Sequence, residues 1–406
     1  MRILSSFLLF LSLLSQLSFS ASKRPVDVLL YGHGIGDSKA LQQIIKELKK
    51  TNLSYTVVAS GEGIKVLEEQ KDIHTLKWGS LKKKADPLRS SEIEYLKQQW
   101  KPRIVLTGMS SVAQAEVLNA FPKAKRVILY DKFEDPRNIS SLKPFLKTVG
   151  SVDVCLVPSQ SLIPSFEVLF KGTQIEVVGH PALKEWENVF FNIDRSKLRQ
   201  KLGIEPTQKV VVFFGGRGEG YQESLDLFCN AVKNHSGWKV LVVPYPAEDG
   251  WTEKKAVGHK SHMSVEMGYA LPELASIADA VVCPRLSVCP MVFLMGVPCV
   301  YLESKDYSDS FIERGWIERL QTKAQLEQWL IGALEEKPEP WTTRRNRIQN
   351  FAQGEIPAAP SAQIIASILE GLTAPEIRLA PAVVTPEAED GPTVLVVKSK
   401  TFKREK

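Results

Sequence analysis

Cysteine and histidine are scarce in this chain of 406 residues, which has five cysteines and six histidines. The cysteine count is odd and no CxxC pair occurs, so neither a disulfide framework nor a cysteine zinc site is indicated. His259 and His262 lie three residues apart, but the pattern supplies no third ligand, and we predict no metal site. We interpret most of the cysteines as small buried hydrophobic residues, a use that fits a reducing compartment.

The chain also lacks a basic stripe with interleaved aromatic residues. Its formal net charge is +6, and Lys398–Lys406 alone holds five basic side chains and one glutamate. The rest is therefore close to neutral, which argues against a nucleic-acid-binding protein. Residues 373–406 are rich in Pro, Ala and Glu, with little periodicity, and we predict a disordered tail with a basic end.

Residues 1–22 form a long segment that has an apolar centre and no acidic residue. Arg2 is followed by uncharged residues up to Ser22, and small residues close the run. This layout is typical of a signal peptide, with an uncleaved N-terminal anchor as the alternative. We therefore expect an exported or membrane-anchored protein; the alternative is association with a membrane surface on the cytoplasmic side.

The most informative stretch is 271–303, LPELASIADAVVCPRLSVCPMVFLMGVPCVYLE. It predicts a short helix (Leu271–Asp279), a buried strand (Ala280–Cys283), a polar break, a second helix (Cys289–Met295) and another strand (Cys299–Leu302). This is a βαβ unit whose strands are apolar on both faces, as in a parallel sheet covered by helices. Ligands of such sheets bind beyond the carboxyl ends of the strands, where the loop with Arg285 and Ser287 lies. A packed βαβ unit without a ligand is the alternative.

This stretch resembles the donor-binding segment of the GT-B glycosyltransferases and the related UDP-sugar 2-epimerases. In those families a PELL-type helix, an "ADLVV" strand, a loop of small residues and a "GVPAIYLP" strand bind a nucleotide diphosphate sugar. Two positions depart from that pattern. Pro284-Arg285 replaces a Ser-Gly pair, and Met291 stands where many members have a ribose-binding glutamate.

A second candidate loop, Gly32-His33-Gly34-Ile35-Gly36-Asp37, joins an apolar strand (Val26–Tyr31) to a periodic helical segment (38–50). A glycine-rich turn lets a ligand approach backbone amides at a helix N-terminus, although Asp37 also suits a helix cap. The loop is similar to the first loop of lipid-A-disaccharide synthase, "GE-x-SGD". The resemblance implies that it faces the acceptor, with Asp37 or His33 as the general base.

Two more strand ends in this half carry polar residues, and a third carries His180. Gly108 and Ser110 follow the strand Ile104–Thr107, where small hydroxyl groups hold a ligand or cap the next helix. Asp131 and Glu134 follow the strand Arg126–Tyr130 and suit either a general base or pairing with nearby cations.

His180 follows the predicted strand Gln174–Val178 within "VGHPAL". On residue type alone it is structural. The segment is similar to the "VGHPL" of lipid-A-disaccharide synthase, which precedes that enzyme's interdomain linker. The resemblance implies that His180 lies at the cleft.

The second half begins with the strand Lys209–Phe214, which runs into Gly215-Gly216-Arg217-Gly218-Glu219-Gly220. Free amides and a guanidinium converge in such a loop, so it predicts an anion site, with a flexible hairpin as the alternative. By the GT-B resemblance, Gly215, Gly216, Arg217, Gly218, Arg285 and Ser287 would hold the diphosphate and sugar, without a metal or other cofactor.

We therefore predict an α/β protein of GT-B-like architecture, with two facing Rossmann-like domains and a cleft between them. The expected segments are an N-terminal, acceptor-side domain (23–185), a nucleotide-sugar-side domain (205–345) and C-terminal helices that cross back (346–372). The resemblance implies transfer of a sugar from a nucleotide diphosphate sugar, most simply a UDP-sugar, to a lipid or glycan acceptor. A non-catalytic GT-B-like binding protein and a UDP-sugar 2-epimerase are the alternatives.

Overall fold

The structure, a computed structural model, describes residues 23–68, 75–78, 86–216, 220–245, 248–284, 288–303, 308–335 and 340–373. Residues up to Thr373 form one compact unit, which contains two parallel β-sheets covered by helices. The predicted α/β class with two Rossmann-like halves is confirmed.

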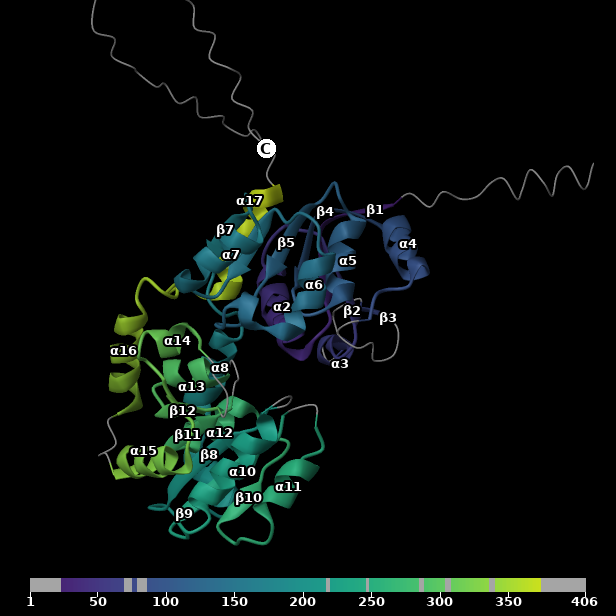
Figure 1. The fold of residues 1–406 in the computed structure, drawn as a ribbon. Helices are drawn as coiled ribbons and strands as arrows, with labels where there is room; N and C mark the ends of the chain where they lie inside the picture. The colour runs from purple at the N-terminus through teal and green to yellow at the C-terminus, as the bar shows by residue number, and fades with distance from the viewer. Residues whose placement is uncertain are drawn as a thin grey trace, which may run out of the picture. The chain divides into compact units, whose positions relative to one another are not determined.

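The N-terminal sheet has seven parallel strands in the order β3-β2-β1-β4-β5-β6-β7 (Figure 1). Leu29 and Tyr31 of the first strand pack into one core, and Val28 and Leu30 pack into another on the opposite face. A strand that is apolar on both faces requires helices on both sides, as predicted. The strands are β1 (Arg24–Gly32), β2 (Tyr55–Ser60), β3 (Thr75–Trp78), β4 (Trp100–Gly108), β5 (Lys125–Leu129), β6 (Val154–Val157) and β7 (Gln174–Val177).

Helices cover both faces of this sheet. α2 (Ile35–Leu48) and α3 (Gly63–Glu68) pack on one face. The opposite face is covered by α4 (Ser90–Gln99), α5 (Val112–Ala120), α6 (Lys143–Thr148) and α7 (Ile163–Leu169). Short 3₁₀ turns, η1 (Pro136–Asn138), η2 (Ser140–Leu142) and η3 (Gln160–Leu162), precede α6 and α7.

The C-terminal sheet has six parallel strands in the order β10-β9-β8-β11-β12-β13. α10 (Tyr221–Val232), α11 (Trp251–Val257) and α15 (Lys323–Glu335) cover one face, and α12 (Leu271–Ile277), α13 (Val288–Leu294) and α14 (Ser310–Glu313) pack into the core on the other. The strands are β8 (Lys209–Phe214), β9 (Trp238–Val243), β10 (Met263–Val265), β11 (Ala280–Cys283), β12 (Cys299–Leu302) and β13 (Glu318–Leu320). The predicted strands of the 271–303 stretch agree with β11 and β12 residue for residue.

Three helices between and after the sheets also join the core of the C-terminal half. Phe190 of α8 (Leu183–Asn192), Leu198 of α9 (Arg195–Lys201) and Ile348 of α16 (Trp341–Ala352) are buried there. The chain between the sheets is therefore helical and packed rather than extended.

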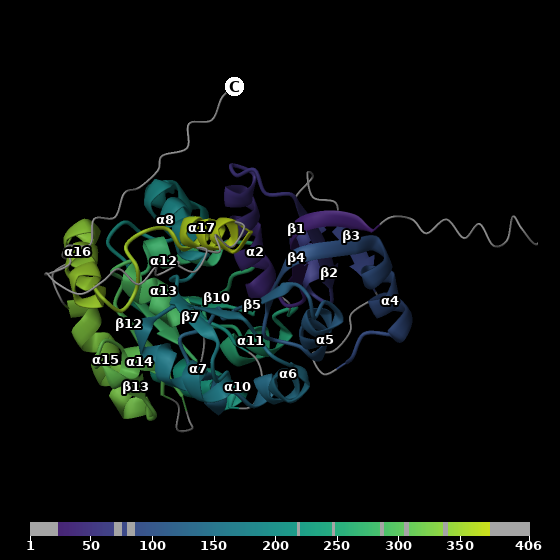
Figure 2. The same cartoon turned by 90° about the horizontal axis from the view of Figure 1, so that it is seen from above.

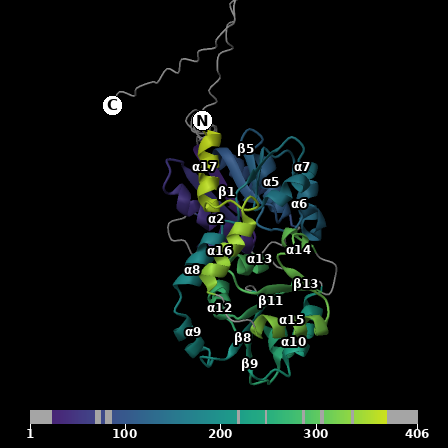
Figure 3. The same cartoon turned by 90° about the vertical axis from the view of Figure 1, so that its left-hand side faces the viewer.

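The last helix, α17 (Ser361–Thr373), returns to the N-terminal sheet and lies beside α2 (Figures 2 and 3). Ile365 and Leu369 are fully buried in the core that α2 shares with the sheet. An apolar stripe at helical spacing in α17 explains this return.

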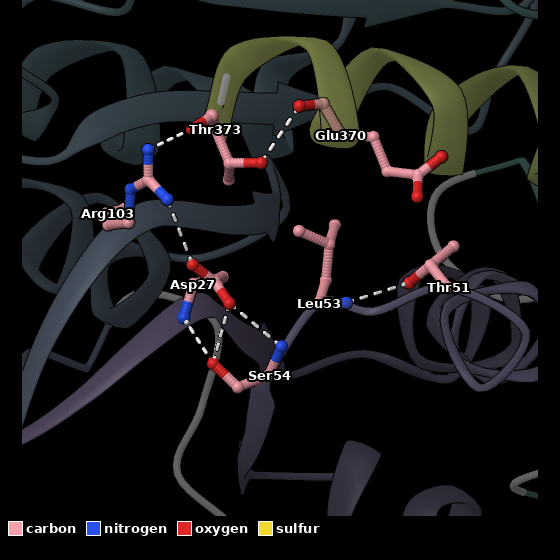
Figure 4. Close-up of polar contacts among 7 residues, drawn as sticks. All are labelled: Asp27, Thr51, Leu53, Ser54, Arg103, Glu370 and Thr373. Carbon is pink, nitrogen blue, oxygen red and sulfur yellow. Dashed lines mark hydrogen bonds and ion pairs between the residues drawn. The ribbon is translucent and has the colours of Figure 1, made fainter. Parts of the chain in front are cut away.

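A polar cluster fastens the end of α17 (Figure 4). The Arg103 guanidinium donates to the carbonyl oxygen of Thr373 and to Asp27 Oδ1, the latter at 3.3 Å. Asp27 Oδ2 accepts from the backbone N–H and the hydroxyl of Ser54. The last turn of α17 is thus tied to β1 and β4 near their amino ends, away from their carboxyl ends.

Two element predictions are wrong. The segment 244–263, predicted as a long polar loop, contains α11 and the start of the edge strand β10. The segment 311–320, predicted as one helix, is the short α14 followed by β13, and Gly315 with φ +68° separates them. A left-handed backbone at that glycine stops the helix.

Two predicted segments lie outside the described residues: the signal peptide or anchor at 1–22, and the disordered tail after Thr373. Within the described ranges, no helix combines the length and the hydropathy needed to cross a membrane.

Candidate functional site

The strand order of each sheet reverses at one point. In the N-terminal sheet the chain leaves β1 toward β2 and β3, and then returns to place β4 on the other side of β1. In the C-terminal sheet the same reversal occurs between β8 and β11. Ligands of open α/β sheets bind beyond the carboxyl ends of the two strands at such a reversal. The loops after β1, β4, β8 and β11 carry the predicted site residues except His180, which follows β7.

Asp37 is in the first turn of α2, not at its N-cap, which is Gly34. Its carboxylate accepts a hydrogen bond from the backbone N–H of His33 at 3.0 Å and another from the side-chain amide of Gln114. Asp37 is 4% exposed. Neither donor belongs to α2, so Asp37 does not cap the helix; it ties the turn to α5, and its burial does not suit direct contact with an acceptor.

Gln114 of α5 joins this turn to the loop after β4. Its Oε1 accepts from the backbone N–H groups of Ser110 and Ser111 at 2.7 and 2.9 Å, which leaves Nε2 to donate to Asp37. A side chain on Gly108 would lie 2.7 Å from the Asp37 Cβ, so that position needs glycine. The structure thus brings together Asp37, Gly108 and Ser110, and adds Gln114, which lies 77 residues from Asp37 in the sequence.

His33 is buried on the other side of the turn. Its Nδ1 lies 2.8 Å from the hydroxyl of Ser60, and that hydroxyl lies 2.7 Å from the hydroxyl of Tyr31. Burial raises the pKa of Tyr31, so its phenol stays protonated. Because His33 is 3% exposed and engaged with the end of β2, its side chain supports the loop rather than facing solvent.

Asp131 differs from these two residues. It follows β5, is half-buried, and its Oδ2 would lie 2.5 Å from a Cβ added to Gly36 in the first turn of α2. Its carboxylate accepts no hydrogen bond and forms no ion pair within the part of the chain that the structure describes. An unpaired carboxylate at a strand end beside a helix N-terminus is well placed for proton transfer.

His180 lies beside Asp131, between the two halves. Its Nδ1 accepts from the N–H of Ala182 at 3.2 Å, so Nε2 carries the proton and donates to the Asp131 carbonyl at 3.0 Å. Burial lowers the pKa of His180, against the opposing effect of Asp131. Its ring stacks at 6.0 Å on Phe133, which contacts Phe311 of the C-terminal half. His180 is therefore a neutral packing residue at the junction.

The loop after β8 begins with a glycine whose amide is already used. Gly215 N–H donates to the carbonyl of Val243 at 2.6 Å. A Cβ on Gly215 would lie 2.6 Å from the Val243 oxygen. The Gly215 amide therefore holds the start of the loop to the end of β9, so it is not available to a ligand.

Arg217, Gly218, Arg285 and Ser287 lie outside the described residues, so their predicted role stays a prediction. Their strands are described: β8 and β11 are paired, with Val282 opposite Phe213. The two strands therefore end at the same edge of the sheet.

A cavity of about 310 Å³ lies near this edge. Val243, Tyr245 and Glu266, which follow β9 and β10, line one side, and Lys39 of α2 with Trp186 of α8 line another. A larger cavity of about 740 Å³ lies between α8, α16 and the start of α17. His180 lines this larger cavity, and no other predicted site residue that the structure describes lines either cavity. No cluster of three or more metal-ligating side chains occurs among the described residues.

No family model matches the chain, and no curated protein matches it. Solved structures do match. A UDP-GlcNAc 2-epimerase from Neisseria meningitidis bound to UDP-GlcNAc superimposes with a TM-score of 0.65 at 12% identity, covering 85% of this chain and all of that one. A glycosyltransferase of kitacinnamycin superimposes with a TM-score of 0.56 at 12% identity, covering 86% and 99%. The chain has the GT-B fold. The wall teichoic acid polymerase TagF also superimposes, with a TM-score of 0.54 at 13% identity, covering 86% and 89%. The predicted GT-B architecture is confirmed, and at these identities the likeness is one of fold.

Proposed function

We propose that the protein binds a nucleotide diphosphate sugar between its two sheets and transfers the sugar to an acceptor. The proposal rests on one observation: β1, β4, β8 and β11 are the strands at which the strand order of each sheet reverses, and the predicted loops follow these strands. The 310 Å³ cavity, lined from both halves, is at the lower end of the size of small-molecule sites. Solved structures of the same fold with a bound UDP-sugar support this class of ligand.

The diphosphate is assigned to the paired loops after β8 and β11. Arg217 and Arg285 supply the cationic groups, and backbone amides after Gly216 supply further donors. The leaving diphosphate gains negative charge in the transition state, and fixed donors stabilise that charge without reorganising. This requires no metal ion.

For the general base we propose Asp131 in place of Asp37 or His33. Asp37 is committed to His33 and Gln114, and His33 to Ser60, whereas the Asp131 carboxylate has no such partner. Asp131 would take the proton of the acceptor hydroxyl as its oxygen bonds to the anomeric carbon. The bond from that carbon to the diphosphate breaks, and the nucleoside diphosphate leaves.

Epimerisation of a UDP-sugar is the second candidate, because UDP-GlcNAc 2-epimerases superimpose with the higher TM-score. It needs a base that removes the proton at C2, and Asp131 also suits that step. A binding protein without catalysis is the third candidate. Met291, 2% exposed in α13, replaces the predicted ribose-binding carboxylate and favours it. A lipid acceptor, contact with a membrane surface and export through residues 1–22 stay predictions.

The test is a calorimetric titration of residues 23–373 with UDP, GDP and their sugars, first without metal and then with Mg²⁺. We expect micromolar binding of one nucleotide. Asp131→Asn should keep that affinity and lower turnover by about 10²–10⁴-fold, the usual contribution of a general base. Glu167→Gln, which alters an exposed carboxylate of α7, is the control.

Turnover is followed with and without acceptors, in deuterated water. Deuterium at C2 of the recovered sugar nucleotide would identify epimerisation, and release of nucleoside diphosphate that depends on an acceptor would identify transfer. Binding without either product would leave the binding protein. If no nucleotide binds to the folded protein, the proposed function is wrong.

A further inference from the structure

The imidazole of His180 is fixed at both nitrogens and on one face. Nδ1 accepts a hydrogen bond from the N–H of Ala182 at 3.2 Å, and Nε2 donates to the carbonyl oxygen of Asp131 at 3.0 Å. The ring stacks on Phe133, with the two centroids 6.0 Å apart. Because each nitrogen has a different kind of partner, the ring is held in one orientation and one tautomer.

The backbone around His180 is fixed as well. Gly179 has a left-handed backbone with φ +77°, which glycine adopts without a steric penalty. Its carbonyl oxygen accepts from the hydroxyl of Ser361 at 3.1 Å, and the carbonyl of His180 accepts from the N–H of Leu183 at 3.0 Å. The turn between β7 and α8 therefore presents the imidazole from a well-supported position.

Asp131 depends on this imidazole for its own place. β5 ends at Leu129, and the N–H of Tyr130 still bonds to the carbonyl of Leu156 in β6 at 2.9 Å. Asp131 comes next, and within the described ranges the bond from His180 is the only hydrogen bond that its backbone makes. A carbonyl held in one direction fixes the ψ angle of its residue, and with it the direction in which the side chain leaves the backbone.

The Asp131 carboxylate has little freedom to correct an error in that direction. Its Oδ2 would lie 2.5 Å from a Cβ added to Gly36, so the first turn of α2 blocks movement on that side. A general base must lie within about 2.6–3.2 Å of the atom whose proton it takes. Misplacement by about 1 Å lowers a rate by about 10²-fold.

We propose that His180 is a positioning residue for Asp131, whose Nε2–H holds the backbone of this base so that its carboxylate stays beside the first turn of α2. This rests on the proposed function, because the role of Asp131 comes from it. His180 itself transfers no proton and acts only through the Asp131 carbonyl.

Two amide substitutions of His180 separate its two hydrogen bonds. His180→Gln places an amide N–H close to the position of the imidazole Nε2 and keeps the donor to Asp131. His180→Asn is one methylene shorter, so it reaches only the position of Nδ1 and keeps the acceptor for Ala182. In the full chain, His180→Asn should lower kcat about 10–100-fold and leave the Kd of the bound nucleotide unchanged, whereas His180→Gln should restore most of the turnover.

His262→Asn is the matched control. His262 also directs Nε2 at a backbone carbonyl, that of Val232 in the C-terminal half, at 3.4 Å, and its substitution should leave kcat unchanged. The double variant His180→Asn with Asp131→Asn should be no slower than Asp131→Asn alone, because both changes act on the same base. Losses that multiply in the double variant, or equal losses in His180→Gln and His180→Asn, would overturn the positioning role.

The contact itself can be measured without a substrate. The full chain contains six histidines, and after labelling with ¹⁵N the ring signal absent from both His180 variants belongs to His180. We expect a neutral ring protonated at Nε2, with a proton that exchanges slowly with water. A ring protonated at Nδ1, or a rapidly exchanging Nε2 proton, would show that the Asp131 carbonyl is not held.

The two experiments keep the proposals apart. If the ring has the expected tautomer but the wild type binds no nucleotide or forms no product, the proposed function is wrong, and the role of His180 falls with it. If the wild type turns over and His180→Asn is as fast, the proposed function stands and the positioning role is wrong.

Discussion

Glu355 joins the two halves of the molecule and permits a quantitative prediction. Its side chain is 3% exposed. Oε1 accepts from the backbone N–H of Ser161 in the N-terminal half at 2.9 Å, and Oε2 accepts from the Arg314 guanidinium in the C-terminal half. The backbone carbonyl of Glu355 also accepts from the N–H of Gln160, a contact that a side-chain substitution leaves in place.

The two side-chain contacts differ in energy. Arg314 is 45% exposed, so after loss of Glu355 its guanidinium binds water, and the pair contributes at most about 1 kcal/mol. The Ser161 N–H is partly buried, and a donor left without an acceptor in the protein interior costs about 1–3 kcal/mol. We therefore expect Glu355→Ala to lower the free energy of unfolding by about 1–4 kcal/mol. Glu355→Gln keeps an acceptor for Ser161 and should cost about 1 kcal/mol or less.

The assay is urea unfolding at pH 7, followed by circular dichroism, with Glu313→Ala as an exposed control expected within about 0.5 kcal/mol of the wild type. If Glu355→Ala also falls within that margin, the carboxylate does not hold the two halves together. If Glu355→Gln costs as much as Glu355→Ala, the pair with Arg314 carries the energy, and our division between the two contacts is wrong.

Two more predictions concern single contacts. Gly215→Ala places a Cβ 2.6 Å from the Val243 carbonyl oxygen, so it should destabilise the protein by about 1–3 kcal/mol in thermal unfolding. Gly237→Ala is the control, because no atom lies within 4 Å of its added Cβ, and it should not destabilise the protein in this way. Equal effects of the two substitutions would contradict the close approach at Gly215. Burial by itself would raise the pKa of Asp27, but hydrogen bonds from Ser54 hold that pKa below 3.8. A pKa that is lower in the folded than in the unfolded state stabilises the protein at pH values above the unfolded pKa. Asp27→Asn should therefore lower the free energy of unfolding by its full amount at neutral pH, and this loss should vanish as the pH falls below 3.8. A loss that does not change with pH in urea unfolding would refute this.

The sequence predicts the elements whose pattern is long or strongly apolar. β8, β11 and β12 have the predicted bounds because four or five consecutive apolar residues between polar breaks leave little choice. α11 was missed because it has seven residues, of which only Glu253 and Val257 are buried, and this is too little for a helical period. β10 and β13 have three residues each at the sheet edges, where pairing with a neighbour rather than local pattern decides.

The candidate site shows a similar division. Which loops lie at the strand reversals follows from the βαβ pattern, and the predicted residues other than His180 lie on those loops. What each side chain does there depends on partners far away in the sequence. Asp37 is occupied by Gln114, and Tyr221 by Glu253. No spacing rule supplies such pairs, so the sequence favoured Asp37 over Asp131 as the base.

The return of α17 determines when the N-terminal half can fold during synthesis. The core between α2 and the sheet is closed by Ile365 and Leu369, more than 300 residues after Leu41 of the same core. On a ribosome, the first sheet emerges long before the helix that covers the rest of that face. Until Ser361–Thr373 leaves the exit tunnel, the nascent chain exposes apolar surface there, and such surface promotes aggregation. The N-terminal half, although translated first, completes its fold last.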